Sequence, residues 1–294
     1  MKNIFWPSST CSGLCDRMID IALMSTSAKL LNANLFFNWC RLESTGWERS
    51  GNETKYWHER RYSDYRYENF IQYFNTPDNF KVNSQLPIDY NIFSDYLGGV
   101  FSAYKFHSHF YKSLSLDNFL TVFYETMSKF TPTKKLLDLT SHLPAPDIGL
   151  HLRREDKIRV HTDEGSITAE QLISLDKNTK DVVKELLKTN SSLYIATDCQ
   201  HAKKEYEKEF NLIKDEKQYS LCEQTYVDLY MLSRSKYIVM SSKHSNFALF
   251  ASLINKSKLV YFYNKNCVLY DSWGDRYDNV IYFKNILNHG AGGN

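Results

Sequence analysis

The second half of the 294-residue chain alternates short apolar runs with segments of helical period. Between the runs lie segments such as NTKDVVKELLKTN, in which apolar residues recur at helical spacing. Strands that are joined by crossover helices pair in parallel, so this alternation predicts a parallel sheet covered by helices. The expected strands are IGLHLR (148–153), SLYIATD (192–198), KYIVMSS (236–242) and KLVYFY (258–263).

The first 40 residues repeat the same pattern on a smaller scale. KNIFWPS (2–8) reads as a strand, residues 14–32 as a helix, and ANLFFNW (33–39) as a second strand. From 41 to 145 the pattern weakens, and only residues 116–130 return to helical period.

The segment SHLPAPD (141–147) contains two prolines and is the best candidate for a linker. We therefore expect an α/β protein of two Rossmann-like domains, residues 1–145 and 146–294, that face each other across a central cleft. The final segment NVIYFKNILNHG (279–290) is expected to cross back to the first domain.

Composition excludes several classes of protein. The net charge of +2 provides no basic field for nucleic acid. Six cysteines without C-x-x-C spacing indicate neither a zinc knuckle nor a disulfide framework. The chain has no P-loop, G-x-G-x-x-G or G-x-S-x-G motif. It has neither a signal-peptide apolar region at its start nor a stretch of roughly 18 to 20 apolar residues, so we expect a cytoplasmic location.

Charged and hydroxyl residues follow three of the expected strands. They are HLRREDK (151–157), ATD (196–198) and MSSKHSNFA (240–248). The carboxyl ends of parallel strands meet at one edge of a sheet, which is where such folds bind ligands. Adjacent arginines match the geometry of phosphate, and hydroxyls with free N–H groups before a helix also bind it. The pattern indicates either a site for a nucleotide diphosphate or surface charges in weak local ion pairs.

The stretch GLHLRREDK (149–157) resembles the first motif of the α1,2-, α1,6- and protein O-fucosyltransferase superfamily, with its His-x-Arg-Arg-x-Asp-like signature. It looks most like the α1,6 enzymes and their rhizobial nodulation relatives, in which a Lys also follows the Asp. LYIATD (193–198), residues 225–253 and residues 12–37 are similar to further motifs of the superfamily. The resemblance covers the first 40 residues and roughly 147–262, and it leaves out the middle of the chain.

The resemblance implies a GT-B fold and an inverting transfer of fucose from GDP-fucose. Bond cleavage leaves negative charge on the β-phosphate, which many glycosyltransferases neutralise with a metal ion held by Asp-x-Asp. This chain has no Asp-x-Asp, so no metal or other cofactor is expected. Arg153 and Arg154 would take the role of the metal, and Lys157 would assist. The candidates for the general base are His161, Asp163 and Glu164, although they depart from the usual glutamate spacing of the family.

Several candidates keep more than one interpretation. His151 either touches the nucleotide or orients the loop by hydrogen bonding. Asp198 either binds guanine or ribose, or caps the helix after it. Asp228 either pairs with an arginine, binds the base, or faces solvent. Arg17 and the adjacent Asp16 either face the cleft or belong to a solvated first turn.

The hydroxyl and amide residues around 241–246 either reach phosphate oxygens or cap the helix that follows. Gly13 either lets the backbone approach the donor or forms a plain turn. The full predicted donor-binding set is Gly13, His151, Asp156, Lys157, Asp198, Asp228, Ser241, Ser242, Ser245 and Asn246.

The expected partners are a nucleotide-sugar donor and a glycan or lipid-linked saccharide acceptor, with peripheral association at the inner face of the membrane and no nucleic acid. The aromatic and basic run 56–67 either stacks on the acceptor glycan or is a solvated loop, and HSH at 107–109 is half a metal site at best. Two alternative functions remain: transfer from another GDP-sugar, such as a heptose or another deoxyhexose, and a non-catalytic glycan- or nucleotide-binding module.

Overall fold

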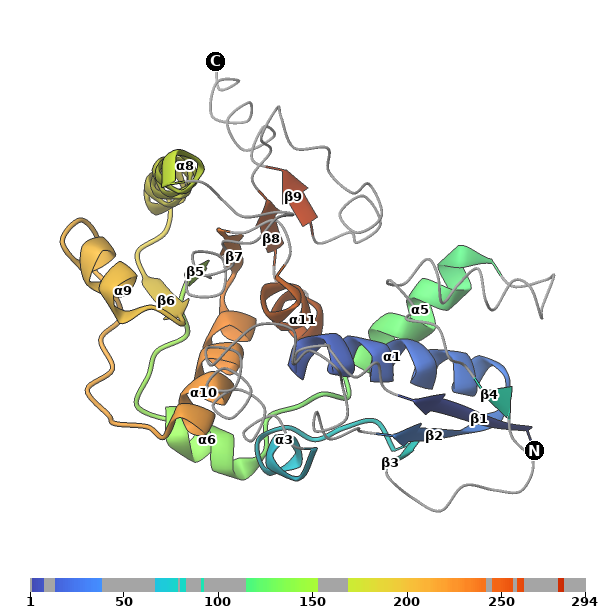
Figure 1. Ribbon diagram of the computed structural model, residues 1–294. Coiled ribbons are helices and arrows are strands. Elements are labelled where there is room, and N and C mark those ends of the chain that lie inside the picture. Colours follow the sequence, from blue (N-terminus) through green and yellow to red (C-terminus); the bar gives the residue numbers. More distant parts are fainter. Residues whose placement is uncertain are drawn as a thin grey trace, which may run out of the picture. The chain divides into compact units, whose positions relative to one another are not determined.

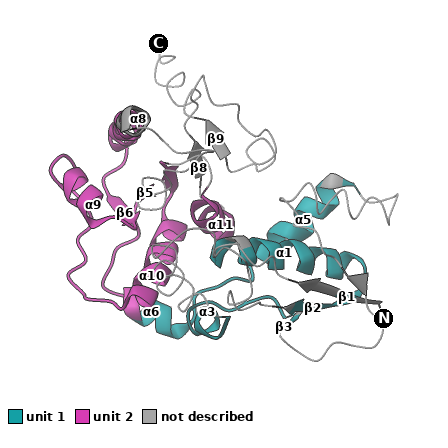
Figure 2. Cartoon of the chain, viewed as in Figure 1, with its two compact units in different colours: residues 1–138 teal, residues 139–294 magenta. Residues whose placement is uncertain are grey.

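The structure is a computed structural model, and the chain divides into two compact units, Met1–Asp138 and Leu139–Asn294 (Figure 2). The division falls inside α6 (Lys134–Thr140), whereas the sequence predicts a boundary at 145/146. The residues that the structure describes are 2–7, 14–38, 67–78, 80–82, 91–92, 115–152, 169–241, 245–255, 258–261 and 280–282.

Unit 1 contains a parallel sheet in the order β3-β2-β1-β4 (Figure 1). The helix α1 (Leu14–Leu30) connects β1 to β2, as the sequence predicts for residues 2–39. The strands are β1 (Lys2–Pro7), β2 (Ala33–Asn38), β3 (Phe80–Val82) and β4 (Asn91–Ile92).

The helix α1 is buried on every side from residue 17 to residue 28. It packs against α5 (Leu116–Met127), where Lys29 pairs with Glu125 at 2.8 Å. Arg17 is only 2% exposed, so the solvated first turn considered for it is wrong, while the side chain of Asp16 lies outside the described part. The remaining described helices of this unit are α3 (Tyr67–Tyr73) and α6, which straddles the boundary.

Unit 2 is built on a second parallel sheet, in the order β6-β5-β7-β8-β9 (Figure 1). This confirms the predicted parallel α/β arrangement of the second half. Strand β9 pairs with β8, so the described part of segment 279–290 belongs to unit 2 and does not cross to unit 1. The strands are β5 (Ile148–Leu152), β6 (Leu193–Thr197), β7 (Tyr237–Met240), β8 (Lys258–Tyr261) and β9 (Val280–Tyr282).

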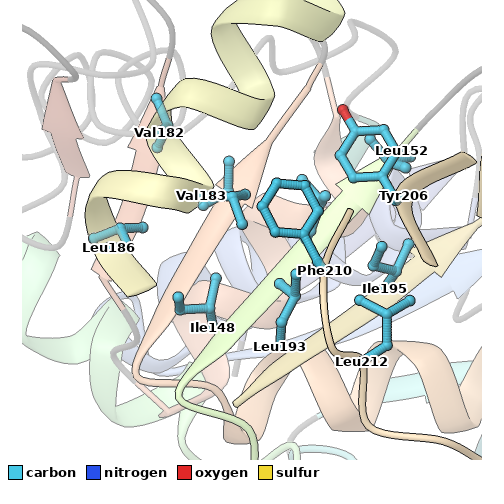
Figure 3. Packing of buried hydrophobic residues seen from close by; sticks show 12 residues of the cluster. Ile148, Leu152, Val182, Val183, Leu186, Leu193, Ile195, Tyr206, Phe210 and Leu212 are labelled. Carbon is cyan, nitrogen blue, oxygen red and sulfur yellow. The ribbon is translucent and has the colours of Figure 1, made fainter. Parts of the chain in front are cut away.

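The helices of unit 2 cover both faces of this sheet. On one face, alternate residues of β5 and β6 meet α8 and α9 in a continuous apolar cluster (Figure 3). On the other face, α10 packs on β5 and β6, and α11 packs on β7 and β8. The helices are α8 (Ala169–Leu187), α9 (Gln200–Glu207), α10 (Leu221–Arg234) and α11 (Asn246–Asn255).

The predicted linker 141–147 makes hydrogen bonds within unit 2. The Asp147 carboxylate accepts hydrogen bonds from the backbone N–H and hydroxyl groups of Ser191 and Ser192, which hold the pKa of that carboxyl below its usual value. Arg234 donates to the carbonyl oxygen of Leu143 at 3.3 Å. These contacts attach the segment to the sheet that begins at Ile148.

Gly149 allows α10 to approach β5 closely. A Cβ atom at this position would lie 2.5 Å from Ser235 Oγ and 2.8 Å from Leu232 Cδ2. We therefore expect Gly149→Ala to destabilise the protein by about 1–3 kcal/mol through overpacking, which exceeds the roughly 0.4–1 kcal/mol that alanine gains by restricting the unfolded chain.

Urea unfolding of Gly149→Ala, Ser235→Ala and the double variant measures this effect. Removing the Ser235 hydroxyl takes away the nearest clashing atom, so the double variant should be more stable than the sum of the single changes predicts. Strict additivity would contradict the close contact.

Candidate functional site

The carboxyl ends of β6, β5 and β7 lie side by side in the sheet of unit 2. The structure thus brings His151, Asp198 and Ser241 to one edge, as the sequence predicts for the ends of parallel strands. The helix α11 begins near the same edge, since Ser245, which directly precedes it, lies within hydrogen-bonding distance of His151.

His151 connects β5 to the start of α11. Its Nδ1 atom lies 2.8 Å from Ser245 Oγ, its ring stacks on Phe247 at 5.2 Å and 26°, and its carbonyl accepts from the Ser241 N–H. Hydrogen bonding by His151 is thus a feature of the fold, while its contact with a nucleotide stays a prediction.

Ser245 caps α11 and also contacts His151. Its Oγ atom accepts from the Ala248 N–H at 3.3 Å and lies 2.8 Å from Nδ1 of His151, where the tautomer of the ring decides which group donates. Capping of the helix and contact with the predicted site thus occur together.

Ser241 carries a buried hydroxyl at the end of β7. The residue is fully buried, and among the described residues no donor or acceptor contacts its Oγ atom. Such groups are uncommon, because an unsatisfied buried hydroxyl costs free energy. Asn246 is the first residue of α11 and is partly buried.

Asp198 is exposed directly after β6. The residue at the N-cap of α9 is Cys199, which makes no side-chain capping bond, so the helix-cap interpretation of Asp198 is wrong. The turn is held by the Cys199 N–H, which donates to Thr197 Oγ1 at 3.1 Å. The carboxylate of Asp198 therefore lies at the edge of the sheet without serving to cap α9.

Asp228 lies in the middle of α10 and is only 8% exposed, so the solvent-facing alternative is wrong. Its Oδ1 atom accepts from the Tyr194 hydroxyl at 2.6 Å and from Gln224 Nε2 at 2.8 Å. Burial raises the pKa of Asp228 to about 6, although these two hydrogen bonds favour the charged form. Burial and the adjacent carboxylate raise the pKa of Tyr194 well above its ordinary value.

Sequence reasoning missed Tyr194 and Gln224. The signals were present: Tyr194 alternates with the apolar residues of β6 and so faces α10, and Gln224 precedes Asp228 by four residues, one helical turn. Both patterns predict contact with Asp228 only after α10 is known to pack on β6.

The other predicted residues lie outside the part of the chain that the structure describes, and their roles stay predictions. In the described ranges, no group of three or more His, Cys, Asp or Glu residues is placed to hold a metal ion. None of the described helices is long and apolar enough to cross a membrane. The undescribed candidates are Gly13, Arg153, Arg154, Asp156, Lys157, His161, Asp163, Glu164 and Ser242.

No protein-family model matches the chain, and no curated protein sequence is significantly similar to it. Among solved structures it is similar to fucosyltransferase NodZ from Bradyrhizobium, with a TM-score of 0.52, 13% identity, and coverage of 90% of this chain and 97% of NodZ. The chain shares the fold of this structure. This confirms, at the level of the fold, the resemblance that the first motif indicates.

Two further solved structures are similar to the chain at lower scores. One is NodZ α-1,6-fucosyltransferase co-crystallized with GDP, with a TM-score of 0.49, 13% identity, and coverage of 86% of this chain and 93% of the other. The other is Arabidopsis thaliana FUT1 in complex with GDP, with a TM-score of 0.44, 16% identity, and coverage of 88% and 69%.

Proposed function

We propose that this chain is an inverting glycosyltransferase that moves fucose from GDP-fucose to a glycan hydroxyl without a metal ion. The observation that carries the proposal is the position of β5 between β6 and β7. The sequence continues from β5 directly into Arg153 and Arg154, so the proposed diphosphate-binding motif follows a strand that has a neighbour on each side. The fold shared with fucosyltransferase NodZ supports the same conclusion.

In the proposed reaction, the acceptor oxygen forms a bond to C1 of fucose on the face opposite GDP. The bond from C1 to the β-phosphate oxygen breaks, and its electron pair leaves with GDP. Arg153 and Arg154 stabilise the charge that develops on the diphosphate, with help from Lys157. The acceptor proton passes to a base among His161, Asp163 and Glu164.

The described residues supply further donor contacts in this proposal. His151 and the buried hydroxyl of Ser241 contact phosphate or sugar oxygens, close to the start of α11. Asp198 accepts from ribose hydroxyls, and Asp228 accepts from the base. Asp156, Ser242, Asn246 and Gly13 are the remaining proposed donor contacts.

The wider setting follows from the same proposal. The two units form the two halves of a GT-B enzyme, with the donor bound by unit 2 and the acceptor by unit 1. The acceptor is a lipid-linked or nascent surface polysaccharide, modified in the cytoplasm at the inner face of the membrane. The aromatic and basic run 56–67 is the proposed contact for the acceptor glycan.

A thermal-shift panel of GDP, UDP, CMP and ADP, each alone and as its sugar conjugate, tests the donor. At about 100 times its dissociation constant, GDP should stabilise the protein by about 2.7 kcal/mol and raise Tm by a few degrees. The shift should persist in excess EDTA, since no metal takes part. Stabilisation by UDP but not by GDP would overturn the donor assignment, and loss of the GDP shift in EDTA would overturn the metal-free mechanism.

A further inference from the structure

The start of α11 holds the imidazole ring of His151 by two contacts of different kinds. Ser245 directly precedes the helix, and its Oγ atom lies 2.8 Å from Nδ1 of His151. Phe247, the second residue of the helix, stacks on the imidazole with the ring centroids 5.2 Å apart and an interplanar angle of 26°. One contact fixes an edge of the ring and the other fixes a face, so together they restrict rotation about both side-chain torsions of the histidine.

Both contacts come from a helix whose own position is fixed. The helix α11 packs on β7 and β8, and its residues 248–254 are buried. Its start is capped by Ser245, whose Oγ atom accepts from the Ala248 N–H at 3.3 Å. The backbone of His151 is held as well, because its carbonyl oxygen accepts from the Ser241 N–H at 3.1 Å beside the paired strands β5 and β7. The histidine and its two supports therefore belong to the rigid part of unit 2.

Phe247 differs from the phenylalanine one turn after it. Phe250 is fully buried in unit 2, whereas Phe247 is only partly buried. Within the described residues, the ring that contacts Phe247 is the imidazole of His151. This placement is that of a support for the histidine rather than that of a core residue.

We propose that Phe247 and Ser245 are positioning residues that hold the ring of His151 in the orientation in which it contacts the donor's diphosphate. The inference rests on the proposed function and adds what keeps this contact in place. Hydrogen bonds are directional, so a histidine that is already oriented loses less rotamer freedom when the donor binds. Ser245, which the sequence predicts as a phosphate contact, then acts through the histidine, and Phe247 enters the site as a residue without a polar atom.

A double-mutant cycle between Phe247 and His151 tests the proposal. Phe247→Leu removes the stacked ring and keeps an apolar side chain, so the dissociation constant for GDP should rise about three- to tenfold. His151→Ala should raise it about ten- to hundredfold, the cost of a hydrogen bond to a charged group. Adding Phe247→Leu to His151→Ala should cost no further affinity, because Phe247 acts only through the histidine. Calorimetric titrations with GDP measure all four proteins.

Conservative variants and a second ligand sharpen the result. Phe247→Tyr keeps the ring and Ser245→Thr keeps the hydroxyl, so both should bind GDP like the natural chain. Guanosine, which carries no phosphate, should bind equally to the natural chain and to Phe247→Leu. In steady-state kinetics Phe247→Leu should raise KM for GDP-fucose and change kcat little.

Ser252→Ala is the matched control for a change within α11. Ser252 is buried about two turns after Ser245, and its hydroxyl donates within the helix to the carbonyl oxygen of Leu249 at 2.7 Å. This variant should keep the GDP affinity of the natural chain. An unfolding curve for each variant shows that the protein titrated is folded.

The failure of this role and the failure of the proposed function give different results. Binding of UDP but not GDP by the natural chain would overturn the proposed function. If the natural chain binds GDP, the positioning role alone is overturned by any of three results: folded His151→Ala or Phe247→Leu keeps full GDP affinity, the two losses add in the double variant, or Phe247→Leu weakens guanosine as much as GDP. Additive losses would mean that Phe247 supports the fold independently of the histidine.

Discussion

Replacing Arg153 or Arg154 by alanine is expected to lower the rate of fucose transfer by about 10²–10³-fold, the usual cost of losing one donor to charge that develops in the transition state. The expectation follows from the proposed chemistry, in which no metal shares the charge of the departing GDP. Arg154→Lys should lose less, because the charge remains while the bidentate geometry is lost. Steady-state kinetics of GDP release should show the loss mainly in kcat.

A surface variant separates this effect from a general loss of charge. Lys208 is 70% exposed and pairs only with the neighbouring Glu205 in the described part of the chain, so Lys208→Ala should retain full activity. Should Arg153→Ala and Arg154→Ala stay folded and keep transfer within about threefold of the natural chain, the pair would lie outside the machinery that stabilises the leaving group.

The sheet of unit 2 was predictable because its strands carry two independent signals. Each is a short apolar run, and each is bounded by a helical segment long enough to cross over to the next strand. The edge at which ligands bind follows from this topology alone. The strand order β6-β5-β7-β8-β9 could not be predicted, because the apolar runs do not indicate which strands are neighbours in the sheet.

Individual side chains were harder to predict, because each had two local interpretations that tertiary packing decides. Asp198 looks like a helix cap until α9 is seen to begin at Cys199. Asp228 is compatible with a solvated helix face until α10 packs on β6 and buries it. His151 was predicted to make a hydrogen bond or to touch the nucleotide, and its hydrogen bond with Ser245 is present in the structure.

Asp228→Asn is expected to stabilise the protein above about pH 6 while it weakens GDP binding. The folded-state pKa of about 6 lies above the ordinary value of 3.8, so ionisation costs more in the folded chain than in the unfolded chain. The penalty is absent below the ordinary value, grows as pH rises through the window between the two values, and is complete above about 6. Asparagine removes the penalty, and its Oδ1 atom can still accept from Tyr194 and Gln224.

The expected gain in the free energy of unfolding is up to about 3 kcal/mol at about pH 8 and close to zero at about pH 4. Urea titrations at both pH values measure this gain, and Asp181→Asn, at an exposed position on α8, is the control without a pH-dependent gain.

The affinity of Asp228→Asn for GDP should fall, because the amide nitrogen then takes the place of Oδ2 and presents a donor to the N–H of the base. If ionised Asp228 lowers the free energy of unfolding and the neutral variant binds GDP less tightly, the carboxylate serves ligand binding rather than the stability of the fold. Equal stability of the two proteins at both pH values would mean that surrounding groups already compensate the buried charge, which removes this argument for a binding role of Asp228.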